Sequence, residues 1–242
     1  MRKLLFLVLG HSLFSAAHAE DRHIFTSGTH QTPLVELYTS EGCSSCPPAD
    51  QWFSKLAQAP GLWTEFVPVA FHVTYWNYLG WDDRFSQKSF DQRQQRRARS
   101  AGAVVYTPGI FLAGDEYRSW RFNRKAPSKS DQLAGQLTIT VSDGQVDATY
   151  TGAETTQQPR LELAMLASNQ TTDVRSGENR GRTLAHDFVV ATLAQHPMQR
   201  QDDQWSASFT LPETVEFEAN GLAAWVSDDN GVPLQATGGW LD

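Results

Sequence analysis

The sequence predicts an α/β domain followed by an all-β domain, and three observations support this fold class. Up to Trp120, short apolar β-type runs alternate with segments of helical periodicity. Residues 121–130 are polar and contain Pro127, as linkers often do. Beyond them the helical periodicity largely disappears, and short strand-like runs alternate with turn residues. We therefore expect domains at residues 20–130 and 131–242.

Residues 1–19 have the features of a secretory signal peptide. A basic start at Arg2 and Lys3 precedes an apolar run over residues 4–14, and a small-residue A-x-A motif ends at Ala19. The apolar run is well short of the ~20 residues that a membrane-spanning helix needs, and no later run approaches that length. We expect cleavage after Ala19 and a periplasmic or extracellular mature protein without a membrane span.

The chain is acidic, with a formal net charge of −7 at pH 7. Loss of the signal peptide removes Arg2 and Lys3 and no acidic residue, so the mature charge becomes −9. This charge argues against nucleic acid and anionic membrane surfaces as partners. A basic stretch from Arg93 to Arg99 precedes Gly102, where cations favour a helix C-terminus. We interpret this stretch as a solvated helix end.

The first domain is predicted to contain a β-α-β unit, then a second helix and a hairpin. The first helix has apolar residues at i, i+3, i+4, i+7 and i+8 and stops at Pro60-Gly61. The second helix is polar and arginine-rich, and the hairpin turns at Gly114-Asp115. The expected elements are a strand at 34–39, a helix at 47–58, a strand at 66–73, a helix at 86–101, and paired strands at 109–112 and 116–120.

The second domain is predicted to be a β-sandwich of about a hundred residues. Its clearest signal is a hairpin, with strands at 138–141 and 146–150 on either side of the Asp143-Gly144 turn. Further strand candidates with turn residues between them lie at 161–166, 188–193, 205–209 and 223–226.

The only two cysteines, Cys43 and Cys46, lie in the turn from the first strand into the first helix. Proline is tolerated in a first helical turn, so Pro47 and Pro48 should occupy the first two helical positions. Cys46 is then at or near the helix cap, and Cys43 is in the turn before it. In open α/β sheets the carboxyl ends of the strands are where sites form, so both thiols are expected at such an edge.

Three interpretations of the cysteine pair differ in what they require. As a structural staple the bridge closes only a four-residue loop, worth ~1.9 kcal/mol against ~4.7 for a hundred-residue loop. As a metal site it supplies two thiolates, with only His72 as a distant third ligand. As a redox couple it benefits from the helix N-terminus, which lowers a thiol pKa. The redox couple is favoured, with the more exposed Cys43 as nucleophile and Cys46 as resolving thiol.

A second segment strengthens the redox interpretation. The dipeptide Thr107-Pro108 lies at the start of a predicted strand. With the C-x-x-C motif after the first strand, it makes residues 33–121 resemble the thioredoxin superfamily, in which such a dipeptide with a cis peptide bond faces the cysteine pair. The resemblance implies a cis Thr107–Pro108 bond, and a Thr107 backbone available to pair with an extended substrate.

More narrowly, three stretches of the first half look like the secreted thioredoxin-like family known as domain of unknown function 1223. They are LYTSEGCSSCPPAD, HVTYWNYLGWDDRF and TPGIFLAG, and in the second half GENRGRTLAHDFVV is similar to that family's later strands. The resemblance implies an α/β thioredoxin-like domain followed by an all-β sandwich-like C-terminal domain, outside the cytoplasm. It implies no activity, because none is established for the family.

The loop from His72 to Asp83 has both a functional and a structural interpretation. His72 ends the second strand, on the same edge as the cysteines, and aromatic residues including Trp76 follow it. An aromatic rim could bind a substrate peptide, and His72 could stabilise or deprotonate a thiol. Alternatively, the aromatic residues are interface core and His72 is a hydrogen-bonded core residue. His186, in the second domain, is interpreted as structural.

The function predicted from these features is a secreted thiol–disulfide oxidoreductase without a cofactor. With one cysteine pair it cannot regenerate itself, so it needs a thiol or disulfide substrate and an external redox partner. Whether it acts as oxidase, reductase or isomerase stays open. Two alternatives are a copper(I) carrier using Cys43, Cys46 and His72, and an interaction module whose disulfide is inert.

Overall fold

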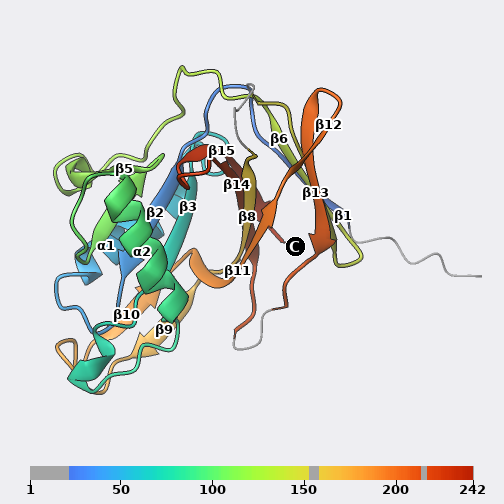
Figure 1. Ribbon diagram of the computed structural model, residues 1–242. Helices are drawn as coiled ribbons and strands as arrows, with labels where there is room; N and C mark the ends of the chain where they lie inside the picture. Colours follow the sequence, from blue (N-terminus) through green and yellow to red (C-terminus); the bar gives the residue numbers. More distant parts are fainter. Residues whose placement is uncertain (1–21, 153–157, 214–216, 242) are drawn as a thin grey trace, which may run out of the picture.

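The computed structural model describes residues 22–152, 158–213 and 217–241, and the predicted signal peptide at 1–19 lies outside them. The protein is mostly β-structure with few helices. Its strands form an eight-stranded, a five-stranded and a two-stranded sheet. Figure 1 shows the two long helices at one end of the molecule and the five-stranded sheet at the other.

The eight-stranded sheet carries the cysteine turn at the end of one of its strands. Its order is β15-β14-β8-β11-β3-β2-β4-β5. In its first-half part β2 runs parallel to β3 and antiparallel to β4, whereas β4 pairs with β5. These strands are β2 (Leu34–Thr39), β3 (Val67–His72), β4 (Gly109–Leu112) and β5 (Asp115–Glu116).

Strands from the second half of the chain continue the same sheet. The junction is a parallel pairing of β11 with β3, through Val189 and Ala70. The strands on this side are β8 (Arg160–Ala167), β11 (Val189–Pro197), β14 (Gly221–Ser227) and β15 (Pro233–Trp240). Residues on both sides of the predicted boundary at 130 therefore share one hydrogen-bonded sheet.

The five-stranded sheet has the order β1-β6-β7-β13-β12. Its apolar side chains, including Ile139 and Val146, form one buried cluster with Leu163 of β8 and Ala224 of β14. The predicted hairpin is confirmed as β6 and β7, whose turn at Asp143 and Gly144 has positive φ at both residues. The strands are β1 (Arg22–Thr26), β6 (Leu137–Ser142), β7 (Gln145–Tyr150), β12 (Gln199–Gln201) and β13 (Gln204–Thr210).

The helices follow the sequence prediction closely. The apolar face predicted for 47–58 is buried, with Ala49, Trp52 and Phe53 in the core. The arginine-rich helix also forms, slightly shorter than its predicted range. The helical segments are α1 (Pro47–Lys55) with η1 (Leu56–Gln58), η2 (Asn77–Leu79), α2 (Lys88–Ser100) and η3 (Arg118–Arg121).

Helices α1 and α2 cover opposite faces of the sheet. Successive residues of a strand point to alternate faces, so Glu36 and Thr39 of β2 point in opposite directions. The Thr39 hydroxyl donates to Asp50 of α1, whereas the Glu36 carboxylate binds Arg93 of α2. The cysteine turn, which follows β2 directly, leads the chain into α1.

Two predictions about local structure are wrong in part. The predicted hairpin is present as the β4–β5 pair, but its second strand does not extend to residue 120. β5 ends at Glu116, and η3 then brings Trp120 against Trp52 of α1, with ring centroids 6.0 Å apart. The basic stretch is a solvated helix end only at Arg96 and Arg99, which are exposed. Arg93 and Arg97 are buried, because α2 turns these two side chains toward the sheet.

Arg93 and Arg97 belong to a buried network of charges between α2 and the sheet. Arg93 binds Glu36 of β2 at 2.6 Å and also Glu162 of β8, and Arg97 binds Glu36 at 2.5 Å. Burial alone would raise the pKa of Glu36, but Arg97 and Arg93 lower it to about 2. Two features of the sequence indicate this network, and the sequence interpretation missed both. Glu36 is the one charged residue in β2, and the two arginines are spaced i, i+4, which places them on the same face of α2.

Candidate functional site

The cysteine turn has the geometry that the sequence predicts. Cys46 is the N-cap of α1, and Pro47 and Pro48 take the first helical positions. The Cys43 N–H donates to the Ser40 carbonyl and the Cys46 N–H to the Cys43 carbonyl, each at 3.1 Å. Cys43 and Cys46 are joined by a disulfide, with their Cα atoms 5.4 Å apart.

Both cysteines are fully buried. Cys43 and Cys46 each have 0 % of their surface exposed, although Ser44 and Ser45 between them are exposed. The expectation that Cys43 is the more exposed thiol is therefore wrong, because the turn packs inward against its surroundings. In this conformation neither cysteine is open to solvent.

Trp76 connects the cysteine turn with the Thr107-Pro108 segment. The Thr107–Pro108 peptide bond is cis, as predicted. The indole N–H of Trp76 donates to the Thr107 hydroxyl at 2.8 Å. The backbone of Trp76 lies against the turn so closely that a Cβ added to Gly42 would be 3.0 Å from the Trp76 Cβ. The structure thus brings Trp76, Thr107 and the cysteine turn together.

Pro108 lies beside the end of β2. In the β2–β4 pairing Gly109 is opposite Tyr38, so the next position along β4 toward its N-terminus, Pro108, is level with Thr39. Thr39 is the last residue of β2 before the cysteine turn. The proline and the start of the cysteine turn therefore lie at the same edge of the sheet.

The aromatic loop after His72 is packed against the core by most of its aromatic side chains. Tyr75 and Trp76 are half-buried and pack against the core, and the Trp81 indole N–H donates to Glu41 at 2.8 Å. Tyr78, in contrast, is 80 % exposed. The loop is anchored by three aromatic side chains and presents the fourth to solvent.

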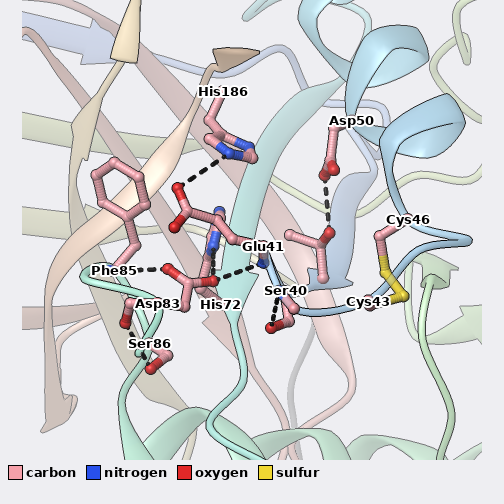
Figure 2. Close-up of polar contacts among 12 residues, drawn as sticks. Ser40, Glu41, Cys43, Cys46, Asp50, His72, Asp83, Phe85, Ser86 and His186 are labelled. Carbon is pink, nitrogen blue, oxygen red and sulfur yellow. Dashed lines mark hydrogen bonds and ion pairs between the residues drawn. A yellow bond between two sulfur atoms is a disulfide. The ribbon is translucent and has the colours of Figure 1, made fainter. Parts of the chain in front are cut away.

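His72 is directed away from the disulfide. It is fully buried, and its Nδ1 lies 2.7 Å from Asp83 Oδ2. The ring centroids of His72 and His186 are 4.8 Å apart, and His186 Nε2 lies 3.4 Å from Glu41 Oε1. In Figure 2 this cluster is at the left and the disulfide at the right, with Asp50 between them in the view. The hydrogen-bonded core interpretation of His72 agrees with these contacts.

Three members of this buried cluster were missed by the sequence interpretation. His186 was assigned a structural role only, and Asp83 and Asp50 were not identified at all. A signal was present, since each lies in one of the stretches that resemble the family: Asp50 four residues after Cys46, Asp83 at the end of the aromatic loop, and His186 in GENRGRTLAHDFVV. Only folding brings β10 (Thr183–His186), the aromatic loop and α1 to the same place.

Asp50 is the buried acid nearest to Cys46 along the chain, one turn later in α1. Its Oδ1 accepts a hydrogen bond from the Thr39 hydroxyl at 2.8 Å, whereas its buried Oδ2 has no hydrogen-bond partner. Burial raises the pKa of Asp50, and the charges of His186 and His72 offset this only in part. The carboxyl is therefore easier to protonate than an ordinary aspartate.

A loop from the second half of the chain contacts the cysteine turn. It connects β9 (Gln170–Asp173) with β10, and these strands form the two-stranded sheet, which was not predicted. The Asn179 amide donates to the carbonyls of Glu41 and Cys43, at 2.8 and 2.9 Å. The Ser44 N–H donates to Glu178 at 3.2 Å. The sequence interpretation of the turn included none of these contacts.

The described residues contain no cluster of three or more His, Cys, Asp or Glu side chains that could hold a metal ion. Cys43, Cys46 and His72, the ligands of the copper-carrier alternative, are not brought together, because His72 pairs with Asp83. Within the same described ranges, the helices are all too short or too polar to cross a bilayer.

Fold and site together define a mostly β protein with a C-x-x-C disulfide at the N-terminus of its first helix. The chain belongs to the family described as protein of unknown function (DUF1223), whose model matches residues 34–227. No curated protein matches the chain.

Two solved structures are similar to this one over most of its length. A crystal structure of a protein from Agrobacterium tumefaciens has 24 % sequence identity and a TM-score of 0.62, covering 88 % of this chain and 94 % of that one. HBP35 of Porphyromonas gingivalis has 13 % identity and a TM-score of 0.59, covering 89 % of this chain and 77 % of that one. At these identities the likeness concerns the fold alone.

Proposed function

We propose that this protein is a thiol–disulfide oxidoreductase that works outside the cytoplasm. In this proposal residues 33–121 are a thioredoxin-like unit, and residues 131–242 contribute a β-sandwich-like domain. The observation that carries the proposal is the position of the Cys43–Cys46 disulfide, at the N-terminus of α1 and at the same sheet edge as the cis Thr107–Pro108 bond. The signal-peptide features of residues 1–19 support the compartment.

The turn supplies what the chemistry of a thiolate requires. The helix dipole favours negative charge at the N-terminus of α1. Pro47 and Pro48 have no N–H, and the N–H groups of Ala49 and Asp50 donate to the Cys46 carbonyl, so the dipole is the effect that α1 contributes. A thiolate at Cys43, in the turn before α1, is stabilised by this dipole. Cys46 is held within disulfide-bonding distance by the turn, because their Cα atoms are 5.4 Å apart.

The proposed reaction is two successive thiol–disulfide exchanges. In the reducing direction the Cys43 thiolate attacks a substrate disulfide, forms a mixed disulfide and releases the first substrate thiolate. The Cys46 thiolate then attacks the Cys43 sulfur, closes the Cys43–Cys46 disulfide and releases the second. The substrate gains two electrons and, after protonation, two protons, and the cysteine pair loses them. The oxidising direction is the reverse.

The reaction needs an external partner, since the chain has no further cysteine. A dithiol reductant would regenerate the reduced form in one direction, and a disulfide oxidant the oxidised form in the other. The reduction potential of the pair, measured against glutathione, decides between the two directions.

The surroundings of the turn favour a polypeptide substrate. Thr107 lies at the same sheet edge as the cysteine turn, and its backbone groups could pair with an extended strand there. Trp76 holds Thr107 by a side-chain hydrogen bond. Tyr78 is 80 % exposed and Val104 is 68 % exposed, on the two loops that Trp76 and Thr107 connect. Exposed apolar side chains near a reactive group are suited to bind an unfolded or extended segment.

The test is a trapping experiment with the full chain. Cys46→Ser should accumulate mixed disulfides through Cys43, whereas Cys43→Ser should not. Wild-type protein should reduce or oxidise a peptide disulfide with turnover that Cys43→Ser abolishes, and Ser44→Ala serves as the matched control in the same turn. Trapping by Cys43→Ser but not Cys46→Ser would reverse the roles, and no turnover by wild type in either direction would refute the proposal.

A second candidate is an interaction module with an inert disulfide. The observation in its favour is the complete burial of both cysteines, since a structural bridge needs no access. This candidate predicts that a Cys43→Ser/Cys46→Ser double variant retains its binding partners, and that glutathione does not reduce the bridge in the folded wild-type protein.

A further inference from the structure

The loop between β9 and β10, residues 174–182, is held in one conformation by hydrogen bonds within the loop and to the aromatic loop. Its two ends are joined, because the Val174 N–H donates to the Arg182 carbonyl at 2.9 Å and the Gly181 N–H to the Val174 carbonyl at 2.8 Å. The Ser176 hydroxyl donates to the Gly80 carbonyl in the aromatic loop. The tip of this loop is therefore held in place against the cysteine turn.

Asn179 is the residue through which the loop holds the backbone of the turn. Its side chain is buried, with 0 % of the residue exposed. Its Nδ2 group donates to the carbonyls of Glu41 and Cys43, and its Oδ1 accepts from Arg182 at 2.9 Å. Since the Cys43 carbonyl also accepts the Cys46 N–H, the peptide group between Cys43 and Ser44 is held from two directions.

Glu178 acts on the same turn through its charge. Its Oε2 accepts the Ser44 N–H at 3.2 Å. That N–H belongs to the residue after Cys43, so the Glu178 carboxylate binds the backbone directly beside Cys43. The hydrogen bonds from Ser44 lower the pKa of Glu178, which keeps the carboxylate charged. Glu178 thus binds the backbone N–H of the residue next to Cys43 and places a negative charge close to Cys43.

We propose that Asn179 and Glu178 are positioning residues that keep the reduction potential of the Cys43–Cys46 pair low. This inference rests on the proposed redox function. Asn179 acts through geometry, because a rigid turn keeps the two sulfurs at bonding distance and favours the disulfide. Glu178 acts through charge, because it disfavours the Cys43 thiolate and with it the reduced form. A couple is more oxidising when its reduced form is stabilised, so loss of either contact should raise the potential.

The other charged groups around the turn are the same in every variant compared. Glu41 lies before Cys43, Asp50 follows Cys46 in α1, and Arg182 binds Asn179. The His72–Asp83 pair lies behind Glu41, whose N–H donates to Asp83. Their contributions are common to wild type and Glu178→Gln, whereas Asn179→Ala also releases Arg182 from its hydrogen bond.

The first measurement is the redox equilibrium of the full chain in glutathione and dithiothreitol buffers. Asn179→Ala and Glu178→Gln should each raise the equilibrium constant for reduction about tenfold, which is about 30 mV for a two-electron couple. Asp147→Asn is the matched control, because it removes one exposed carboxylate from β7 in the other sheet. This control should leave the equilibrium unchanged.

The second measurement separates geometry from charge. In a Cys46→Ser background, the thiol pKa of Cys43 is read from its thiolate absorbance. Glu178→Gln should lower this pKa, with an effect that weakens at high salt, whereas Asn179→Ala should leave it within error. A purely structural role for either residue would change the unfolding temperature but neither of these readouts.

The outcomes distinguish this inference from the redox function on which it rests. If wild type exchanges with the buffers and both variants keep its equilibrium constant, the positioning role is wrong and the redox function stands. If wild type does not exchange at all, both are wrong. Should Asn179→Ala lack a cooperative unfolding transition, Glu178→Gln alone decides, because an exposed side chain tolerates this nearly isosteric change.

Discussion

His72 and Asp83 form an ion pair in the interior, with Nδ1 and Oδ2 2.7 Å apart and both side chains fully buried. Burial on its own would lower the pKa of His72, but the Asp83 carboxylate offsets this and the pKa lies above its ordinary value of 6.5. Burial would likewise raise the pKa of Asp83, but His72 and two backbone N–H groups hold it below 3.8. Near neutral pH the pair is therefore charged on both sides.

This pair should make stability depend on pH. Because the pKa of His72 is raised on folding, its protonation increases the free energy of unfolding. This contribution is complete below pH 6.5 and is lost as the pH rises through the folded-state pKa. Because the pKa of Asp83 is lowered on folding, its ionisation also increases the free energy of unfolding. This contribution is complete above pH 3.8 and is lost as the pH falls through the folded-state pKa of Asp83. We expect His72→Asn to lower the free energy of unfolding by about 3 kcal/mol at about pH 5.5, and by less at about pH 9.

Urea denaturation of wild type and His72→Asn at the two pH values measures this difference. His30→Asn is the control, because His30 is exposed. An equal loss at both pH values would show that His72 contributes packing rather than charge.

Arg93 should be the most sensitive charged position in the fold. It binds Glu36 of β2 and Glu162 of β8 in a buried setting, so it connects strands from the two halves of the chain. Arg93→Met leaves both carboxylates without their shared cation and should cost about 3–5 kcal/mol of unfolding free energy. Arg96→Met, on the exposed side of the same helix, should change it by less than about 0.5 kcal/mol. Similar small effects for both variants would contradict the ion network.

Trp76 and Thr107 should be energetically coupled. The indole N–H to hydroxyl bond is 2.8 Å long and part-buried, so it should contribute about 1 kcal/mol. Trp76→Phe removes the donor and Thr107→Val the acceptor, and the double variant should lose less than the two single losses combined. A double-mutant cycle in urea measures this coupling. Strictly additive losses would mean that the bond contributes nothing to stability.

Gly238 should not tolerate a side chain. A Cβ added there would lie 2.4 Å from the Leu222 carbonyl oxygen and 2.9 Å from the Trp63 ring. Gly238→Ala should therefore cost about 1–3 kcal/mol, because the backbone of β14 must shift. Gly28→Ala is the comparison, since no atom lies within 4 Å of an added Cβ. Thermal unfolding of both variants tests the prediction, and an equal midpoint for the two would refute it.

Local pattern determined much of the first half and part of the site. The run at 34–39, the apolar face of 47–58 and the Asp143-Gly144 turn each depend on neighbours within a few residues, and each is present in the structure. The cysteine turn at the helix N-terminus and the cis Thr107–Pro108 bond were likewise predicted, the first from local rules and the second from a resemblance.

Tertiary structure alone decided which distant segments meet. The parallel pairing of Val189 with Ala70 joins both halves in one sheet, and no local pattern specifies a partner more than a hundred residues away. Asn179 contacts the cysteine turn only because the β9–β10 hairpin folds back onto it. The burial of Arg93 depends on Glu36 and Glu162, since a charge leaves water only where opposite charges meet it. The periodicity of a segment shows which face of a helix or strand is apolar. Which other segment covers that face is determined only when the whole chain packs.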